Sequence, residues 1–565
     1  MAYPTHSKTL QETPCINHCK LYVACCMVRT DPCRFRVFSP VHLKPKHRDG
    51  SRKLTAASYG KMSKAINRNS SALNDASRRA SAFIARWTPF CLVAAYLIFS
   101  ICLYMFISNA IFRVFWFVYL TTNFFTSSVT VVESVMSMGA AREARRAVEK
   151  VKDADWVFPT PDDELPILDL IIVAYLPNEK DIIVDRIHYA LENIAYPEDK
   201  IRINLLYNTP YAIEPLETEI SELAIKNSRL RVTKVLNSTS KADNLNHFLT
   251  LDTGAHLIAI FDSDHFTHPY GPRWAAERFM QDSKIDVVQG RCIIYNSASS
   301  FLSSMISVEF DKIYATSHPG RAALWQFGLF TGSNGYWRAN LIRELKMDGS
   351  MLTEDIDSSL RANNLGKKIV HDLNVVSYEL APVKLLSFMR QRLRWTQGWT
   401  QVSIRHIPLA FTKPPAGNRE LTMRFGLFSL LFVREFSYYL VTQYTCLIAS
   451  YVLLNFPISP AELAKTVFFE FPLSEWLFVI GYVCHISKLL SGFWTPCLSY
   501  AYRIGGLVST LVMTYLVLSE FSTLRMMLLF TLIYIPYLVF QSILGLYGHA
   551  RCIVGYSRWN ATTRS

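Results

Sequence analysis

The stretch Leu168-Asp169-Leu170-Ile171-Ile172-Val173 is apolar apart from its aspartate, and a polar turn with Pro177 and Asn178 follows it. A run of Leu, Ile and Val without polar alternation is typical of a strand that is buried on both faces of a sheet. After the turn, Ile183 and Ile187 begin an amphipathic pattern that predicts a helix. The region therefore starts as strand, polar turn and helix.

The same order of strand, turn and helix recurs along the chain. Further strands are predicted over residues 201–207, 230–236 and 256–261. Strands that alternate with helices predict a mostly parallel sheet, whose ligand binds beyond the carboxyl ends of the strands. The sequence therefore predicts an α/β domain with its functional residues at that edge.

Polar side chains follow these predicted strands directly. Tyr175 and Glu179 come after the first strand, Asn208 after the second, and Asp262 and Asp264 after the fourth. Because strand side chains alternate, the two aspartates project the same way. Carboxylate oxygens suit Mg²⁺ and Mn²⁺, and Mg²⁺ usually keeps substrate phosphates among its ligands. This edge is predicted to bind a divalent cation together with a phosphorylated ligand.

A second motif is Met351-Leu352-Thr353-Glu354-Asp355. Thr353 is expected to cap a helix whose apolar positions include Ile356 and Leu360. The acids Glu354 and Asp355 then lie at the rim of that helix. A carboxylate held there is placed to accept a proton.

A third motif is Gln391-Arg392-Leu393-Arg394-Trp395. Residues three and four apart share one face of a helix, so Gln391, Arg394 and Trp395 are expected to point the same way. Arginine binds phosphate oxygens with paired N–H groups, and tryptophan offers a flat apolar surface to a sugar ring. This face suits a diphosphate beside a sugar.

In this order, D-x-D, T-E-D and Q-x-x-R-W resemble the signature of the membrane-embedded family 2 glycosyltransferases, such as cellulose, chitin and hyaluronan synthases. The resemblance covers roughly residues 168–399. It implies a GT-A-like α/β domain inserted between transmembrane helices. The implied activity is that of an inverting, metal-dependent, processive hexosyltransferase, which uses a UDP-sugar to make and export a β-linked polysaccharide.

Two other functions are kept as alternatives. A non-processive enzyme that makes a glycolipid, similar to ceramide glucosyltransferase, also carries D-x-D and Q-x-x-R-W and needs no channel. A transporter or membrane scaffold with a relic domain would leave the motif acids without a role. The several C-terminal spans favour the polymer synthase.

The resemblance implies a role for each matching residue. Catalysis is assigned to Asp355 as the general base, with Glu354 and Thr353. The donor-binding residues are Tyr175, Glu179, Asn208, Lys241, Asp262, Gln391, Arg394, Thr562 and Arg564. The acceptor-binding residues are Trp395, Gln289, Gly332, Ser333 and Asn334, and Mg²⁺ or Mn²⁺ is assigned to Asp264, Asp262 and His265.

The chain departs from the family pattern after the second predicted strand. Many members carry a pair of aspartates there to contact the nucleobase, whereas this chain has Tyr207-Asn208-Thr209-Pro210. Asn208 can still hydrogen-bond a uracil ring. The identity of the base is therefore less firmly indicated than the diphosphate.

Composition and apolar runs predict a membrane protein with a large polar domain. Half of the 565 residues are hydrophobic and 13% are aromatic. Residues 90–112 and 114–132 contain no charged side chain, and Arg113 separates them. Runs of about 20 apolar residues are long enough to cross a bilayer. We expect a transmembrane hairpin over residues 88–137, followed by the transferase domain over residues 140–400.

The C-terminal part predicts further membrane helices over residues 401–550. An interfacial helix is expected over residues 387–407. Candidate spans cover residues 425–454, 473–490, 504–519 and 526–547. Arg434 and Glu435 interrupt the first span, and a charge at mid-bilayer costs about 2.5–3.5 kcal/mol. We therefore expect these two side chains to avoid lipid, and either to face a channel or to mark an interface helix before the true span.

The formal net charge of +14 is concentrated near the N-terminus. Residues 1–87 hold 16 Lys and Arg against 4 acids, so the rest of the chain carries only about +2. A basic segment before a span indicates the cytoplasmic side and contact with anionic lipid, not nucleic acid. We expect this tail to be mostly disordered. Both termini and the transferase domain are then cytoplasmic, in the plasma membrane or alternatively in the Golgi.

Two terminal features leave alternatives open. Residues 559–564 resemble the gating loop of the synthases, which would bring Thr562 and Arg564 to the diphosphate; a frayed tail is the alternative. The cysteines of the N-terminal tail lack two C-x-x-C pairs, which favours free thiols over a zinc site or palmitoylation.

Overall fold

The computed structural model describes residues 56–412, 420–465 and 524–555. The chain divides into two compact units, Met1–Asp75 and Ala76–Ser565, and the sheet and all the contacts below belong to the second. Several predictions lie outside the described residues. They concern the spans over 473–490 and 504–519, the tail cysteines, and Thr562 and Arg564.

Two long helices precede the sheet: α1 (Ala56–Phe106) and α2 (Asn109–Asp153). The structure differs from the expected hairpin in two ways. First, α1 begins at Ala56, inside the tail that was expected to be disordered. Second, the helices break at Ile107 and Ser108 and not at Arg113. A single arginine is well tolerated within a helix, whereas serine is favoured at its N-cap.

One stretch in the described ranges, Ser77–Phe106, is long and apolar enough to cross a membrane by length and composition. Helix α2 continues beyond the expected span to Asp153. It packs against α9 (His318–Trp325). Gly320 makes this packing close, because a Cβ there would lie 1.8 Å from the Glu133 carbonyl oxygen.

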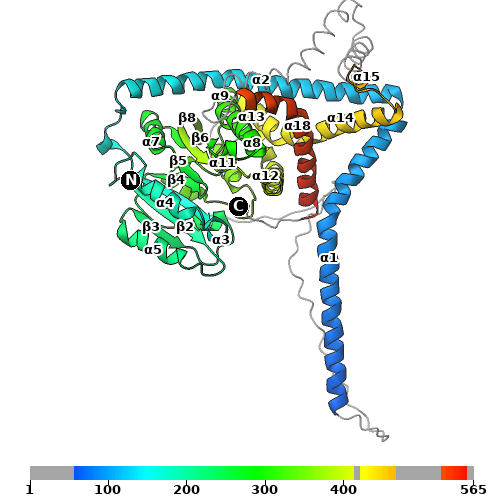
Figure 1. The fold of residues 1–565 in the computed structure, drawn as a ribbon, viewed down its shortest axis with the longest axis horizontal. Helices are drawn as coiled ribbons and strands as arrows, with labels where there is room; N and C mark the ends of the chain where they lie inside the picture. Colours follow the sequence, from blue (N-terminus) through cyan, green and yellow to red (C-terminus); the bar gives the residue numbers. More distant parts are fainter. Residues whose placement is uncertain (1–55, 413–419, 466–523, 556–565) are drawn as a thin grey trace, which may run out of the picture. The chain divides into compact units, whose positions relative to one another are not determined.

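The sheet has eight strands among the described residues, in the order β3-β2-β1-β4-β7-β6-β8-β5 (Figure 1). The strands are β1 (Leu168–Tyr175), β2 (Ile201–Asn208), β3 (Leu230–Lys234), β4 (Leu257–Asp262), β5 (His265–Thr267), β6 (Ile285–Ile294), β7 (Gly335–Arg338) and β8 (Lys368–Glu379). The pairings of β1 with β2 and β4, of β2 with β3 and of β6 with β8 are parallel, which confirms the mostly parallel sheet. Strands β1 to β4 are the predicted ones, and their ends shift by one or two residues.

Helices cover both faces of the sheet and divide its core into two layers. Leu170 and Ile172 of β1 pack with α4 (Ile183–Glu192) and α7 (Gly271–Gln281), whereas Ile171 and Val173 pack with α6 (Lys241–Leu249) and α10 (Ala339–Leu345). The other helices of the domain are α3 (Leu176–Glu179), α5 (Leu216–Lys226), α8 (Phe301–Asp311) and α11 (Glu354–Asn364). This alternation is what a strand buried on both faces requires.

The register of the parallel strands gathers the predicted polar residues at one edge. Tyr175 is paired with Asn208, and Val173 with Asp262. The carboxyl ends of β1, β2 and β4 therefore lie next to one another. The edge predicted from the sequence to bind ligand is formed as expected.

Among the described residues of the C-terminal part, the helices are α12 (Leu385–His406), α13 (Leu421–Phe428), α14 (Arg434–Leu454), α15 (Pro460–Lys465) and α18 (Leu524–Ile553). Helix α12 packs against α11 and α18 (Figure 1). The Arg434 guanidinium lies 3.8 Å from the centroid of the Trp399 ring, and Glu435 pairs with His549 at 2.6 Å. Both charges contact other protein side chains, which agrees with the expectation that they avoid lipid.

Candidate active site

Lys241, the first residue of α6, joins a residue that the sequence assigned to the donor site and one that it assigned to the acceptor site. Its ammonium donates to Asp262 Oδ1 at 2.6 Å and to the Gly332 carbonyl at 2.5 Å. Burial alone would lower the pKa of Lys241, but the charges of Asp262, Glu354 and Asp355 outweigh it and raise the pKa. Lys241 therefore remains positively charged between the end of β4 and the start of α11.

The acids of the T-E-D motif begin α11 as predicted. Thr353 occupies the N-cap position, but its hydroxyl makes no capping hydrogen bond, so that part of the prediction is wrong. Gly332 has φ of +94°, and a Cβ there would lie 3.0 Å from Asp355 Oδ2. Burial and then the charge of Glu354 raise the pKa of Asp355 to about 7. A carboxyl that ionises near neutrality is well suited to accept a proton.

Asp262 and Asp264 lie at the turn between β4 and β5. Together with His265, they offer ligand atoms that all lie within 4.8 Å of one another. Two carboxylates and an imidazole at this spacing fit Mg²⁺ or Mn²⁺. His265 has other neighbours too, since its Nε2 lies 3.2 Å from Glu379 Oε2 and its Nδ1 lies 3.4 Å from Ser377 Oγ. Burial opposes protonation, but the Glu379 charge outweighs it and raises the pKa of His265.

The loop over residues 331–334 is held from behind by two amide side chains. Gln289 Nε2 donates to the Ser333 carbonyl at 3.0 Å, and its Oε1 accepts from the Thr331 amide at 2.9 Å. Asn334 Nδ2 donates to a carbonyl of β8 at 2.9 Å. Gln289 and Asn334 are fully buried, and Ser333 is buried too. Gln289 and Asn334 use their polar groups to fix the loop that carries Gly332. Acceptor contact by Gln289, Ser333 and Asn334 stays a prediction.

Helix α12 places Gln391, Arg394 and Trp395 one turn apart, as predicted. Gln391 is buried, and its Oε1 has no hydrogen-bond partner among the described residues. The positive charge of Arg394 opposes the rise in pKa of both acids of α11. Trp395 lies 4.5 Å from the Arg392 guanidinium, which Glu309 binds through both of its oxygens.

Three further donor-site candidates, Tyr175, Glu179 and Asn208, make hydrogen bonds within the protein. Glu179 Oε2 accepts from the Tyr175 amide at 2.7 Å, and so it fixes the turn after β1. Asn208 Oδ1 accepts from Asn244 at 3.0 Å, and this bond ties the end of β2 to α6. All three candidates lie at the predicted edge of the sheet.

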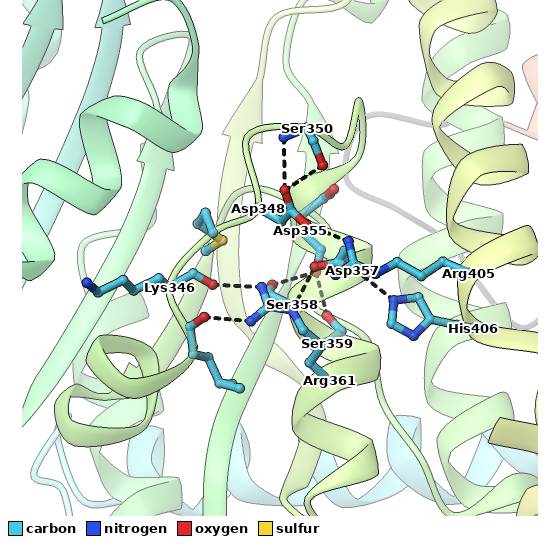
Figure 2. A network of polar contacts seen from close by, with 12 residues as sticks. Lys346, Asp348, Ser350, Asp355, Asp357, Ser358, Ser359, Arg361, Arg405 and His406 are labelled. Atoms are coloured by element: carbon cyan, nitrogen blue, oxygen red, sulfur yellow. Dashed lines mark hydrogen bonds and ion pairs between the residues drawn. The ribbon is translucent and has the colours of Figure 1, made fainter. Parts of the chain in front are cut away.

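A second set of charged groups begins at Asp357, two residues after Asp355. The Asp357 carboxylate is fully buried and lies 2.7 Å from both Arg361 Nε and His406 Nε2 (Figure 2). Burial opposes ionisation, but the His406 and Arg361 hydrogen bonds outweigh it and lower the pKa of Asp357. Arg405 lies 3.5 Å from Asp357. This network ties the end of α12 to α11.

The sequence interpretation missed the network around Asp357. One signal was available, since Asp357 and Arg361 are four residues apart and share a helical face. His406 lies 49 residues away in sequence, so its contact depends on how α11 and α12 pack.

Comparisons with known proteins agree with these motifs. The chain is 28% identical over 243 residues to a probable glucomannan 4-beta-mannosyltransferase of Oryza sativa subsp. japonica, covering 42% of this chain and 41% of the relative. It is 26% identical over 256 residues to the cellulose synthase catalytic subunit (UDP-forming) of Pseudomonas fluorescens, covering 44% of this chain and 33% of that relative. It is 24% identical over 251 residues to the probable glycosyltransferase YdaM of Bacillus subtilis, covering 44% and 59%. The chain thus spans from a third to about three fifths of these relatives.

Among solved structures, a mannosyltransferase from Pyrobaculum calidifontis, in complex with GDP-Man and Mn²⁺, matches 68% of this chain and 99% of its own. The identity is 16% and the TM-score 0.43. The family model described as glycosyl transferase family group 2 matches residues 257–543, just over half of the chain. The matched region runs from β4 through T-E-D and Q-x-x-R-W into α18. The chain therefore belongs to glycosyl transferase family group 2, as its motifs predicted.

Proposed function

We propose that this protein transfers a hexose from a UDP-sugar to a growing β-linked polysaccharide, with inversion at the anomeric carbon. The observation that carries the proposal is the position of Asp355. This carboxyl has a pKa of about 7, and it lies beside Gly332 at the start of α11. Lys241, which binds the Gly332 carbonyl, links the loop beside Asp355 to the D-x-D motif.

The reaction is a single displacement. The acceptor hydroxyl oxygen attacks the anomeric carbon, and the bond from that carbon to the diphosphate oxygen breaks. The hydroxyl proton passes to Asp355, and the diphosphate leaves with the bonding electron pair. Attack from the side opposite to the leaving group inverts the configuration.

Cationic side chains would receive the leaving diphosphate. The Lys241 ammonium lies at the D-x-D motif, and the charge of Arg394, on α12, acts on Glu354 at the start of α11. Gln391, one turn before Arg394 on α12, would add its amide. Asp262 and Asp264 would hold Mg²⁺ or Mn²⁺, which when bound neutralises charge that develops on the diphosphate. Thr562 and Arg564 complete the proposed donor contacts.

Membrane embedding and processivity are further parts of the proposal. Their support is the apolar helix Ser77–Phe106, the packing of α14 on α18, and the similarity to cellulose and glucomannan synthases. We propose a multi-pass protein of the plasma membrane, with its transferase domain and both termini in the cytoplasm. Trp395 would then support the acceptor sugar.

The test uses purified membranes and separate radiolabelled nucleotide sugars, with digestion of any product by linkage-specific hydrolases. We expect one UDP-sugar to give a β-linked polymer. Asp355→Asn should lower transfer by about 10²–10⁴-fold and leave UDP binding largely intact, because the amide keeps the shape but cannot accept the proton.

Asp163→Asn is the matched control, because Asp163 is an exposed aspartate in the turn before β1. It should transfer at the wild-type rate. Full transfer by Asp355→Asn would overturn the assignment of the base. A labelled lipid in place of a polymer would overturn processivity and support the glycolipid alternative.

A further inference from the structure

Three neighbouring strands bring together one imidazole, one thiol and one carboxylate. His265 lies on β5, Cys292 on β6 and Glu379 on β8. One ligand atom from each residue lies within 4.8 Å of the other two, and all three side chains are buried. The pairing of β8 with both β5 and β6 creates this cluster, because His265 and Cys292 are far from Glu379 in sequence.

The three groups differ in chemical kind from the D-x-D carboxylates. A thiolate and an imidazole are ligands that zinc prefers, and a carboxylate oxygen is a common third ligand. Mg²⁺ prefers an all-oxygen shell, so a thiolate disfavours it. The His265 Nε2 and Glu379 Oε2 atoms are 3.2 Å apart, close enough to bind a single ion together.

Ser377 supports this set from β8. Its Oγ lies 3.4 Å from His265 Nδ1 and 3.5 Å from Cys292 Sγ. A hydrogen bond at one ring nitrogen fixes the tautomer and leaves the other nitrogen to face a metal. Here Nδ1 meets the serine and Nε2 faces the Glu379 carboxylate, which is the arrangement that a metal-binding histidine needs.

We propose that His265, Cys292 and Glu379 form a binding site for a thiophilic divalent cation, Zn²⁺, distinct from the oxygen-rich D-x-D site. Zinc binds to the Cys292 thiolate, and the thiol proton is released to solvent. His265 belongs both to this cluster and to the group that it forms with Asp262 and Asp264. Zinc would hold the His265 imidazole in the cluster with Cys292 and Glu379. The binding claim requires neither the proposed reaction nor its substrates.

The experiment titrates the full-length, metal-stripped protein with Co²⁺ as a spectroscopic substitute for Zn²⁺. A thiolate ligand gives a sulfur-to-cobalt charge-transfer band in the near ultraviolet, which carboxylate ligands do not give. We expect Cys292→Ser to bind one equivalent fewer than the wild type and to lose the corresponding band. Other cysteines add the same background to both proteins, so the difference between them is the readout.

Two matched variants make the assignment specific. Cys446→Ser removes another buried thiol, in α14, and should keep the full band. Asp264→Asn alters the D-x-D motif and should keep the band as well. Ser377→Ala should weaken Co²⁺ and Zn²⁺ binding by about 10–100-fold, as loss of a supporting hydrogen bond to a metal ligand typically does.

Equal Co²⁺ stoichiometry and an equal band in Cys292→Ser would overturn the proposal. If Cys292→Ser does not fold, Ser377→Ala and Glu379→Gln decide the question, and unchanged Zn²⁺ affinity in both would also overturn it. Because the readout is metal binding, a failed transfer assay does not affect the result.

Discussion

Asp355 and Asp357 lie on the same first turns of α11, yet their carboxyl groups have opposite electrostatic environments. Burial and the adjacent charge of Glu354 raise the pKa of Asp355 to about 7. Burial also opposes ionisation of Asp357, but hydrogen bonds from His406 and Arg361 lower its pKa. The difference comes from the partners, since both residues are aspartates on one helix.

The comparison distinguishes Asp355, a carboxyl that can gain and lose its proton near neutral pH, from Asp357, a carboxylate whose negative charge is fixed by its partners. Asp355 has Lys241 and Arg394 near it as charges, but no salt bridge to either is formed. Asp357 lies 2.7 Å from a guanidinium and from an imidazole, so it stays an anion (Figure 2). Proton transfer requires the first environment, and anchoring of α12 requires the second.

The largest effect is expected from Asp357→Asn. The amide leaves Arg361 and His406 without their buried anion, and loss of one partner of a buried ion pair typically costs about 3–5 kcal/mol. Because the pKa of Asp357 is lowered, its stabilisation is present above the unfolded pKa of about 4 and is lost as pH falls through the folded value. The deficit, measured by denaturant unfolding, should therefore shrink in acid.

Asp355→Asn is the matched control for that measurement. A carboxyl whose folded pKa is raised loses stability as pH rises from about 4 to 7, so its removal should not destabilise the protein at pH 8. Equal losses of stability in the two variants would show that the comparison between the two aspartates does not hold.

Gly398→Ala should cause the next largest loss of stability. Gly398 lies on α12 between Arg394, whose charge acts on Asp355, and His406, which binds Asp357. A Cβ there would lie 2.5 Å from Thr353 Cγ2, so either the Thr353 side chain or α12 itself must shift. Overpacking of this kind typically costs about 1–3 kcal/mol. Lower transfer together with a lower melting temperature is expected. Gly139→Ala is the control, since nothing lies within 4 Å of a Cβ at that position.

A pH profile sharpens the comparison further. The base must be ionised, so kcat/KM should rise about tenfold between pH 6 and pH 8 as Asp355, with a pKa of about 7, loses its proton. Glu354→Gln removes a charge that raises this pKa and should move the midpoint to lower pH. A variant at Asp357 should leave the midpoint unchanged. A flat wild-type profile would contradict the role of Asp355.

The sequence predicted one half of the sheet better than the other. Strands β1 to β4 are apolar runs in strand-helix order, and their parallel pairing follows from that order. The other half was not predicted, since β5 and β7 have three and four residues and β8 has a run of part-exposed positions before it alternates near its end. Pairing between short, distant strands is a tertiary property that local pattern does not contain.

Part of the candidate site was predictable for a similar reason. Motif spacing placed Asp355 at a helix start and Gln391 and Arg394 on one face, because local helical geometry decides both. It did not show that Gln289 would be fully buried behind a loop. Its hydrogen bonds to residues more than 40 positions away exist only after β6 meets that loop.

The smallest effect is expected from Arg405→Gln, at the exposed end of the Asp357 network. Arg405 lies 2.5 Å from Asp348 and 3.5 Å from Asp357, and its side chain is 44% exposed. Water screens such a pair, so the loss in unfolding free energy should be at most about 1 kcal/mol. A double-mutant cycle with Asp348→Asn measures the coupling free energy between Arg405 and Asp348. This coupling should decrease in 1 M salt, because the Debye length falls to about 3 Å. The cost of Asp357→Asn should persist in that salt, because the Asp357 carboxylate is fully buried. A loss from Arg405→Gln as large as that from Asp357→Asn would mean that Arg405 shares in the buried anchor.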